Sequence, residues 1–85
     1  MASYRILIKP SAVKELEALP PKDRRRIASR IQGLSSDPRP PGCEKLAGQE
    51  LYRVRQGNYR ILYTVSDEEI IVLIIRVGHR RDIHR

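Results

Sequence analysis

Residues 51–65, with the sequence LYRVRQGNYRILYTV, constrain the fold of this chain more than any other segment. Apolar and polar residues alternate on both sides of Gly57-Asn58. This pattern predicts a β-hairpin, because Gly-Asn between two such runs is typical of a two-residue hairpin turn. Such a turn fixes which residues face each other across the two strands. The predicted pairs are Gln56 with Tyr59, Arg55 with Arg60, Val54 with Ile61, Arg53 with Leu62, and Tyr52 with Tyr63.

The predicted register divides the hairpin side chains between two faces, one of which carries Arg53, Arg55 and Arg60. Directly opposed like charges weaken a hairpin by about 0.2–1 kcal/mol, so the fold alone does not favour this arrangement. Basic side chains on exposed strands also discourage aggregation, which would explain any single arginine. For three on one face we favour a phosphate-binding site, because arginine binds phosphate bidentately. The other face is expected in the core and carries Tyr52, Val54, Ile61, Tyr63 and Val65.

The rest of the chain predicts two helices and two further strands. Ser11 is expected to cap the first helix, and Pro20-Pro21 separates it from the second. The nearly continuous apolar run at 70–77 is typical of a central strand buried on both faces. The expected elements are a strand at 3–9, helices at 12–19 and 22–34, a loop at 35–48, the hairpin strands, and a strand at 70–77.

These elements predict one domain of the α/β (α+β) class over residues 1–85. We expect an N-terminal strand and a helical hairpin packed on one face of an antiparallel sheet of about four strands. The head groups of Arg53, Arg55 and Arg60 would then lie on the open face. The core stripe of the second helix is expected to be Ile27, Ile31 and Leu34.

The charge of the chain points to an anionic partner. The net charge is +7 over 85 residues, with a pI of about 10.2, which favours nucleic acid or an acidic protein. The chain has no Phe or Trp and only four Tyr, so platforms for base stacking are sparse. Contacts to backbone phosphates are therefore favoured over reading of bases.

Other classes of protein are disfavoured by the sequence. The single cysteine, Cys43, excludes an internal disulfide, and no Cys/His cluster has zinc spacing, so we expect no metal and no cofactor. We see no signal peptide, and the apolar run at 70–75 is too short to span a bilayer. A cytoplasmic location is expected.

Three stretches resemble the RelE/ParE toxin superfamily: the hairpin at 51–63, the ending VGHRRDIHR at 77–85, and SAVKEL at 11–16 followed by Leu19-Pro20. The resemblance keeps one order over essentially the whole chain. It implies a compact microbial-RNase-like fold. RelE-type members are toxins that cleave messenger RNA in the ribosomal A site and are held inactive by an antitoxin. ParE-type members share the fold and poison DNA gyrase.

The RelE-type resemblance also implies site residues. The first hairpin strand of this family carries two basic residues spaced by two, here Arg53 and Arg55, and the second carries an arginine after a tyrosine, here Arg60. A basic residue follows Val-Gly in the last strand, here Arg80, and a tyrosine is common where this chain has His84. The expected catalytic set is Arg53, Arg55, Arg60, Arg80 and His84, with Lys45, His79 and Arg81 as substrate-binding residues.

Two departures from the family pattern affect the expected chemistry. Some members have lysines where this chain has Arg53 and Arg55. Arginine is effectively always charged, so charge stabilisation is expected of these two residues rather than proton abstraction. His84 replaces the tyrosine and titrates in the range needed for an acid or a base. A disordered terminal histidine is the other interpretation, and both stay open.

The resemblance predicts a metal-independent endoribonuclease in which the 2′-hydroxyl of RNA attacks the adjacent phosphate. Arg60 and Arg80 would stabilise charge on that phosphate, Arg53 and Arg55 would grip it and orient the 2′-hydroxyl, and His84 or else His79 would move protons. The ribosome, messenger RNA and an acidic RelB-like antitoxin are the expected partners, in a hetero-oligomeric toxin–antitoxin complex. The antitoxin is expected to cover the basic surface of 22–34, the arginine face or both.

Simple alternation conflicts with the resemblance at the end of the chain. Carried through residue 77, it places His79 and Arg81 on the Arg60 face, whereas the resemblance selects Arg80. A bulge at Gly78 would reconcile them.

Two other functions remain possible for this chain. One is inhibition of DNA gyrase as in the ParE type, which the missing tyrosine at 84 favours and the retained arginines disfavour. The other is a plain RNA-binding module.

Overall fold

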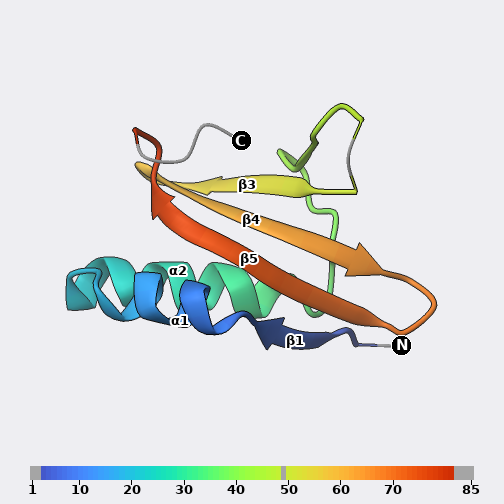
Figure 1. Ribbon diagram of the computed structural model, residues 1–85, viewed down its shortest axis with the longest axis horizontal. Coiled ribbons are helices and arrows are strands. Elements are labelled where there is room, and N and C mark those ends of the chain that lie inside the picture. The colour runs from blue at the N-terminus through green and yellow to red at the C-terminus, as the bar shows by residue number, and fades with distance from the viewer. Residues whose placement is uncertain (1–2, 49, 82–85) are drawn as a thin grey trace.

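The computed structural model describes residues 3–48 and 50–81. Two helices cover one face of a five-stranded sheet, and the other face is free of helices in this part of the chain (Figure 1). The sheet order is β1-β5-β4-β3-β2. The elements are β1 (Arg5–Ile8), α1 (Pro10–Glu17), α2 (Pro21–Gly33), β2 (Glu44–Lys45), β3 (Tyr52–Gln56), β4 (Tyr59–Ser66) and β5 (Ile71–His79).

The predicted class is confirmed, but the sheet is mixed rather than antiparallel. The strands β3, β4 and β5 form the expected antiparallel meander. The first strand, β1, runs parallel to β5 at one edge of the sheet. A parallel pair is possible here because these two strands are far apart in the sequence and are not joined by a tight turn. The additional strand, β2, has two residues inside the predicted loop. A pair this short leaves no recognisable alternation in the sequence.

The helices begin at prolines. Helix α1 starts at Pro10 with Lys9 as its N-cap, and no side chain caps it by a hydrogen bond. The predicted cap at Ser11 is therefore wrong, because the fixed φ of Pro10 suits the first helical position and starts the helix one residue earlier. Pro20 precedes α2, so the predicted break between the helices is confirmed. In the described ranges no helix is both long and apolar enough to cross a membrane.

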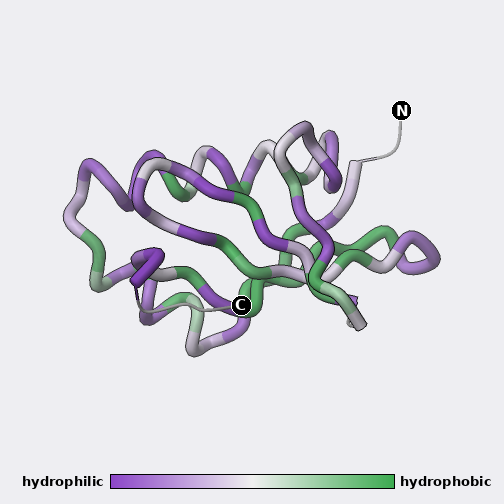
Figure 2. The backbone as a smooth tube through the Cα atoms, turned by 90° about the horizontal axis from the view of Figure 1, so that it is seen from above, coloured by the Kyte–Doolittle hydropathy of each residue, from purple (hydrophilic) through white to green (hydrophobic). Residues whose placement is uncertain are grey.

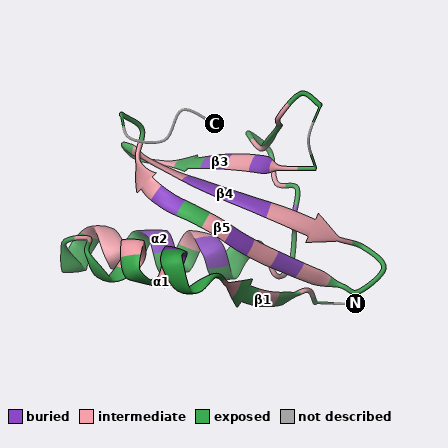
Figure 3. Ribbon diagram, viewed as in Figure 1, coloured by how far each residue is buried: buried purple, intermediate pink, exposed green. Residues whose placement is uncertain are grey.

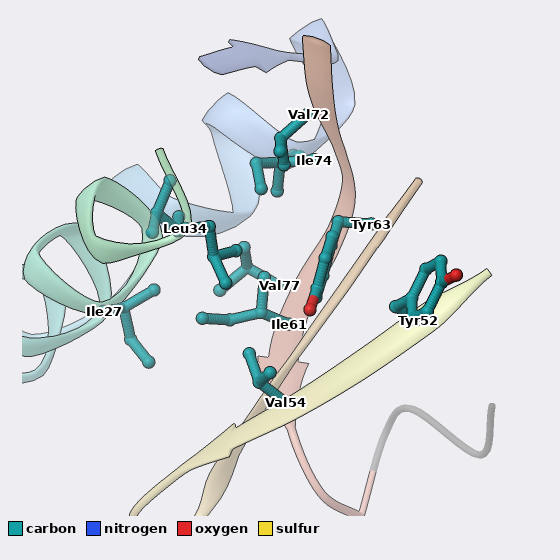
Figure 4. Packing of buried hydrophobic residues seen from close by; sticks show 11 residues of the cluster. Ile27, Leu34, Tyr52, Val54, Ile61, Tyr63, Val72, Ile74 and Val77 are labelled. Carbon is teal, nitrogen blue, oxygen red and sulfur yellow. The ribbon is translucent and has the colours of Figure 1, made fainter. Parts of the chain in front are cut away.

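The core lies between the two helices and the sheet (Figures 3 and 4). Ile27, Ile31 and Leu34 point into it from α2 and the residue after it, as predicted. Tyr63 lies in this core with its side chain fully buried, and its hydroxyl donates a hydrogen bond of 2.8 Å to the Pro38 carbonyl. The predicted core face of the hairpin is confirmed at Tyr52, Val54, Ile61 and Tyr63, while Val65 is partly buried.

The apolar strand β5 is central but is buried on one face only. Val72, Ile74 and Val77 are buried under the helices, whereas Ile71 and Leu73 are half-buried on the opposite face. The prediction of burial on both faces is wrong because both helices pack on the same side of the sheet. Figure 2 shows the hydrophobic first part of β5 beside the hydrophilic turn that joins it to β4.

Candidate nucleic-acid site

The hairpin fold brings the predicted arginines onto one face of the sheet. All five predicted pairs occur in the β3–β4 register, including Arg55 opposite Arg60. The two-residue turn forms as expected, and φ is positive at Gly57 (62°) but not at Asn58, as in a type II′ turn. Because opposed residues share a face, Arg53, Arg55 and Arg60 lie on the side away from the helices. We call this side of the sheet, with these three residues and Arg80, the arginine face.

Arg80 reaches the arginine face because of a β-bulge. In the β4–β5 ladder Leu62 pairs with Arg76, and Tyr63 pairs with Ile74, so Ile75 is an extra residue. An extra residue reverses the alternation of everything after it. Gly78 therefore lies opposite Arg60, and Arg80 is the next residue on that side. The predicted bulge at Gly78 is wrong in position, but the selection of Arg80 over His79 and Arg81 agrees with the observed register.

The guanidinium groups on this face influence one another electrostatically. Burial of the Arg60 guanidinium and then the positive charges of Arg53 and Arg55 lower the pKa of Arg60 below its ordinary value. The charge of Arg80 acts in the same direction, and Glu44 opposes it. Nearby like charges disfavour the charged form of a group. A bound anion would relieve this repulsion, so the face is suited to a phosphate.

Arg53 has an acidic partner that the sequence pattern did not indicate. Its guanidinium lies 3.0 Å from Glu44 Oε1, since β2 places Glu44 directly opposite Arg53. The Arg53 side chain is only 15% exposed, and its Nε is buried with no hydrogen-bond partner within the described ranges. Leu62 is also buried on this face. The acid orients Arg53 and competes with any incoming phosphate.

Lys45 does not join the arginine face. It pairs with Tyr52 and so falls on the opposite side from Arg53. Its ammonium lies 3.5 Å from the Glu50 carboxylate, and both side chains are exposed. The predicted contact of Lys45 with RNA therefore belongs to a different surface from the guanidinium cluster.

The residues after the last strand divide between the two faces. His79 pairs with Tyr59 on the helix side, where the two rings meet edge to face with centroids 5.7 Å apart. Arg81 is exposed, and its backbone N–H donates to Nδ1 of His79 at 3.2 Å. The predicted catalytic His84 lies outside the described residues. No set of three or more His, Cys, Asp or Glu residues within 3–48 and 50–81 is placed to hold a metal ion.

A second basic surface runs along α2, on the helix side of the sheet. The ion pairs in the described part of the chain involve Arg39, Lys45, Arg53 and Arg76, and none of these cations belongs to α2. A groove of about 680 Å³ is lined by Lys22, Arg25, Arg26, Ser29, Arg30, Gly33 and Gln56. The lining contains no apolar side chain, so this groove favours a polyanion over the apolar core of a protein interface.

Comparison with known proteins agrees with this architecture. Residues 6–84 match the family described as the ParE toxin of the type II toxin-antitoxin system parDE. The chain belongs to the RelE/ParE toxin superfamily. Toxin RelG of Mycobacterium tuberculosis is 36% identical over 96% of this chain and 97% of its own length. A putative toxin RelE1 of Methanocaldococcus jannaschii is 28% identical over 96% of both.

Solved structures of this superfamily share the fold. The RelBE2 toxin–antitoxin complex of Mycobacterium tuberculosis contains a chain that matches with a TM-score of 0.84 and 31% identity, over 94% of each chain. In the intact Escherichia coli RelBE complex the match has a TM-score of 0.79 and 28% identity, over 91% of this chain and 96% of that one. The matching family is named after ParE, and these relatives are named RelE and RelG. The comparisons therefore establish membership of the superfamily, which includes both types.

Proposed function

We propose that this RelE/ParE toxin is an endoribonuclease that cleaves messenger RNA in the ribosomal A site and so inhibits translation. The observation that supports it is the guanidinium cluster of Arg53, Arg55 and Arg60, with Arg80 adding its charge. The cluster includes opposed like charges that weaken the sheet. Such an arrangement is explained by a ligand with concentrated negative charge, and RNA phosphate is that ligand.

In the proposed reaction the 2′-oxygen attacks the adjacent phosphorus and loses its proton. A new O2′–P bond forms, the P–O5′ bond breaks, and the leaving 5′-oxygen takes up a proton. The products are a 2′,3′-cyclic phosphate and a 5′-hydroxyl. Arg60 and Arg80 stabilise the charge that develops on the phosphate oxygens, a contribution that is often the largest single one in catalysis. Arg53 and Arg55 hold the phosphate and orient the attacking hydroxyl.

Proton transfer is the weak part of this site. Arginine keeps its charge, so the arginine face supplies no general base. His84 is the proposed acid or base. Without a strong base the toxin should cut free RNA poorly, and the ribosome would supply positioning, which contributes roughly 7–11 kcal/mol in well-oriented systems. In this proposal Lys45, Arg81 and the cations of α2 contact ribosomal RNA.

A RelB-type antitoxin is the proposed protein partner. Solved relatives include toxin–antitoxin complexes from Mycobacterium tuberculosis, Pyrococcus horikoshii and Escherichia coli. The net charge of +7 on this chain favours an acidic partner. We expect association with the purified antitoxin to weaken as salt concentration rises, since exposed charges are screened.

Inhibition of DNA gyrase is the second candidate, because the matching family model is described as the ParE toxin. One experiment separates the two. The purified toxin is added to a translating extract and, separately, to gyrase with supercoiled DNA. Primer extension that shows ribosome-dependent cuts in messenger RNA, with gyrase unaffected, supports the ribonuclease. Gyrase-dependent DNA breaks with intact messenger RNA would replace it with the ParE-type function.

A further inference from the structure

The end of β5 is held by two hydrogen bonds, donated by the backbone N–H groups of Arg80 and Arg81. The Arg80 N–H donates to the Asn58 carbonyl at 2.8 Å, which is the last bond to the hairpin turn. The following N–H, that of Arg81, donates to Nδ1 of His79 at 3.2 Å. The peptide groups on both sides of the Arg80 α-carbon are therefore fixed. One of these two acceptors is a backbone carbonyl, and the other is a titratable side chain.

His79 is itself held from the helix side of the sheet. Its ring meets the edge of the Tyr59 ring at a centroid distance of 5.7 Å and an interplanar angle of 76°. The Tyr59 hydroxyl donates to Asp23 Oδ2 at 3.0 Å. Asp23 lies in the first turn of α2. A continuous chain of contacts thus runs from the start of α2, through two aromatic rings, to the backbone beside Arg80.

The His79 contact requires one protonation state. A neutral imidazole accepts through one nitrogen and donates through the other, whereas a protonated imidazole donates through both. We propose that His79 is a positioning residue, which holds Arg80 on the arginine face by accepting the Arg81 N–H, and that protonation of the imidazole releases this hold. The proton of neutral His79 then lies on Nε2. After protonation, the Nδ1–H of His79 would face the N–H of Arg81, and the hydrogen bond between these residues would be lost. The turn after β5 would then keep only the hydrogen bond from Arg80 to Asn58.

The surroundings of His79 contain groups of both signs. Asp23 and Arg26 of α2 line the same cavity of about 290 Å³ as His79 and Tyr59. Arg80 and Arg81 follow it along the chain. The His79 side chain is partly exposed, so protons can reach its ring from the solvent.

The consequence for activity depends on the proposed ribonuclease function. If Arg80 stabilises the transition state, releasing its backbone should lower the single-turnover cleavage rate by about five- to tenfold, the equilibrium value of one ordinary hydrogen bond. The wild-type rate should therefore be lower when His79 is protonated than when it is neutral.

Two substitutions at one position separate the hydrogen bond from the ring. His79→Asn keeps an acceptor, because asparagine side chains accept from the N–H two residues on, and it does not titrate. His79→Phe keeps a ring against Tyr59 and removes the acceptor. We expect His79→Asn to keep the Arg81 amide protected from hydrogen exchange at pH 5.5 as well as at pH 8, because the asparagine oxygen accepts at both pH values. We expect His79→Phe to be about five- to tenfold slower throughout that range.

Nuclear magnetic resonance of the wild-type protein tests the contact without any RNA. The expected results are an Nε2–H tautomer of His79 at pH 8 and an Arg81 amide that is protected from exchange at pH 8 relative to pH 5.5 after correction for the intrinsic rate. An Nδ1–H tautomer, or cleavage by His79→Phe at the wild-type rate and pH dependence, would overturn the proposal. If the wild-type protein cuts no messenger RNA at all, the ribonuclease function fails, and the tautomer and the Arg81 amide still decide whether His79 holds this turn.

Discussion

Arg55 lies directly opposite Arg60 on adjacent strands, and both project from the face of the sheet that the helices leave uncovered. Two guanidinium groups in this relation repel each other, and the nearby charges of Arg53 and Arg80 increase the repulsion on Arg60. The chain could avoid this with a neutral residue at either position. The repulsion is consistent with the proposal that this face binds phosphate.

This relationship predicts that removing one charge stabilises the fold. Arg55→Thr should raise the free energy of unfolding by about 0.2–1 kcal/mol, because it removes the opposed like charge and introduces a residue that favours strands. The gain should shrink at high salt. Arg55→Lys, which keeps the charge, is the control and should change little. Urea unfolding at two salt concentrations measures both effects, and a clear loss of stability in Arg55→Thr would contradict the repulsion.

Substitution by alanine should have opposite effects on stability at Gly57, in the hairpin turn, and at Gly33, at the end of α2. Gly57→Ala should destabilise the protein by about 1–2 kcal/mol, because Gly57 has a φ of 62° and a side chain is strained there. Gly33 ends α2 without a positive φ, and a β-carbon there would meet no atom within 4 Å. Gly33→Ala should stabilise by up to about 1 kcal/mol. Thermal unfolding of both variants tests the pair; equal effects of the same sign would contradict the turn geometry.

Glu44 is expected to restrain the binding of RNA. Glu44→Gln should release Arg53, strengthen binding of single-stranded RNA and steepen the slope of log K against log salt by about 0.7, the value for one additional phosphate contact. Glu50→Gln is the matched control, since it makes the same charge change beside Lys45, away from the arginine face. Fluorescence titrations over a range of salt concentrations measure the slopes. Identical changes in both variants would show that only net charge matters.

Asp67 is expected to make stability depend on acid pH. Hydrogen bonds from Arg39 and then from Tyr4 lower the pKa of this carboxyl below its ordinary value. Because its pKa is lower in the folded state, Asp67 stabilises the fold above its unfolded pKa of about 3.9, and this stabilisation is lost as pH falls through the folded pKa. Asp67→Asn should therefore melt below the wild type at pH 7, and the difference should close toward pH 2. A constant difference in melting temperature would contradict this.

The hairpin could be predicted from the sequence because its register is local. Gly57-Asn58 fixes the pairing of the strands on either side, and every predicted pair was confirmed. The pairing of β4 with β5 could not be predicted in the same way, because one extra residue at Ile75 changes the face of everything after it. A bulge residue of this kind has no distinctive composition, and Gly78 was the more obvious candidate for a bulge.

The partner of Arg53 was missed for a related reason. Glu44 is brought to it by a strand of two residues, which follows a loop rich in proline and glycine. Two residues are too few to show an alternating pattern, so their pairing is decided by the tertiary fold. The start of α1 could not be predicted to the residue either. Pro10 and Ser11 both suit a helix N-terminus, and only the folded backbone shows that the helix begins at Pro10.

The most direct test of the proposed function compares Arg60→Ala with Arg5→Ala. Arg5 is an exposed arginine on β1, the edge strand that β5 separates from the strand of Arg60, β4. Both variants lose one positive charge. Ribosome-dependent cleavage of translated messenger RNA is measured by primer extension, with thermal stability checked for each protein. Arg60→Ala should cut roughly a hundred- to a thousandfold more slowly than the wild type, the loss typical of one well-placed donor, and Arg5→Ala should cut normally. Normal cleavage by a folded Arg60→Ala would show that the arginine face is not the site of the reaction.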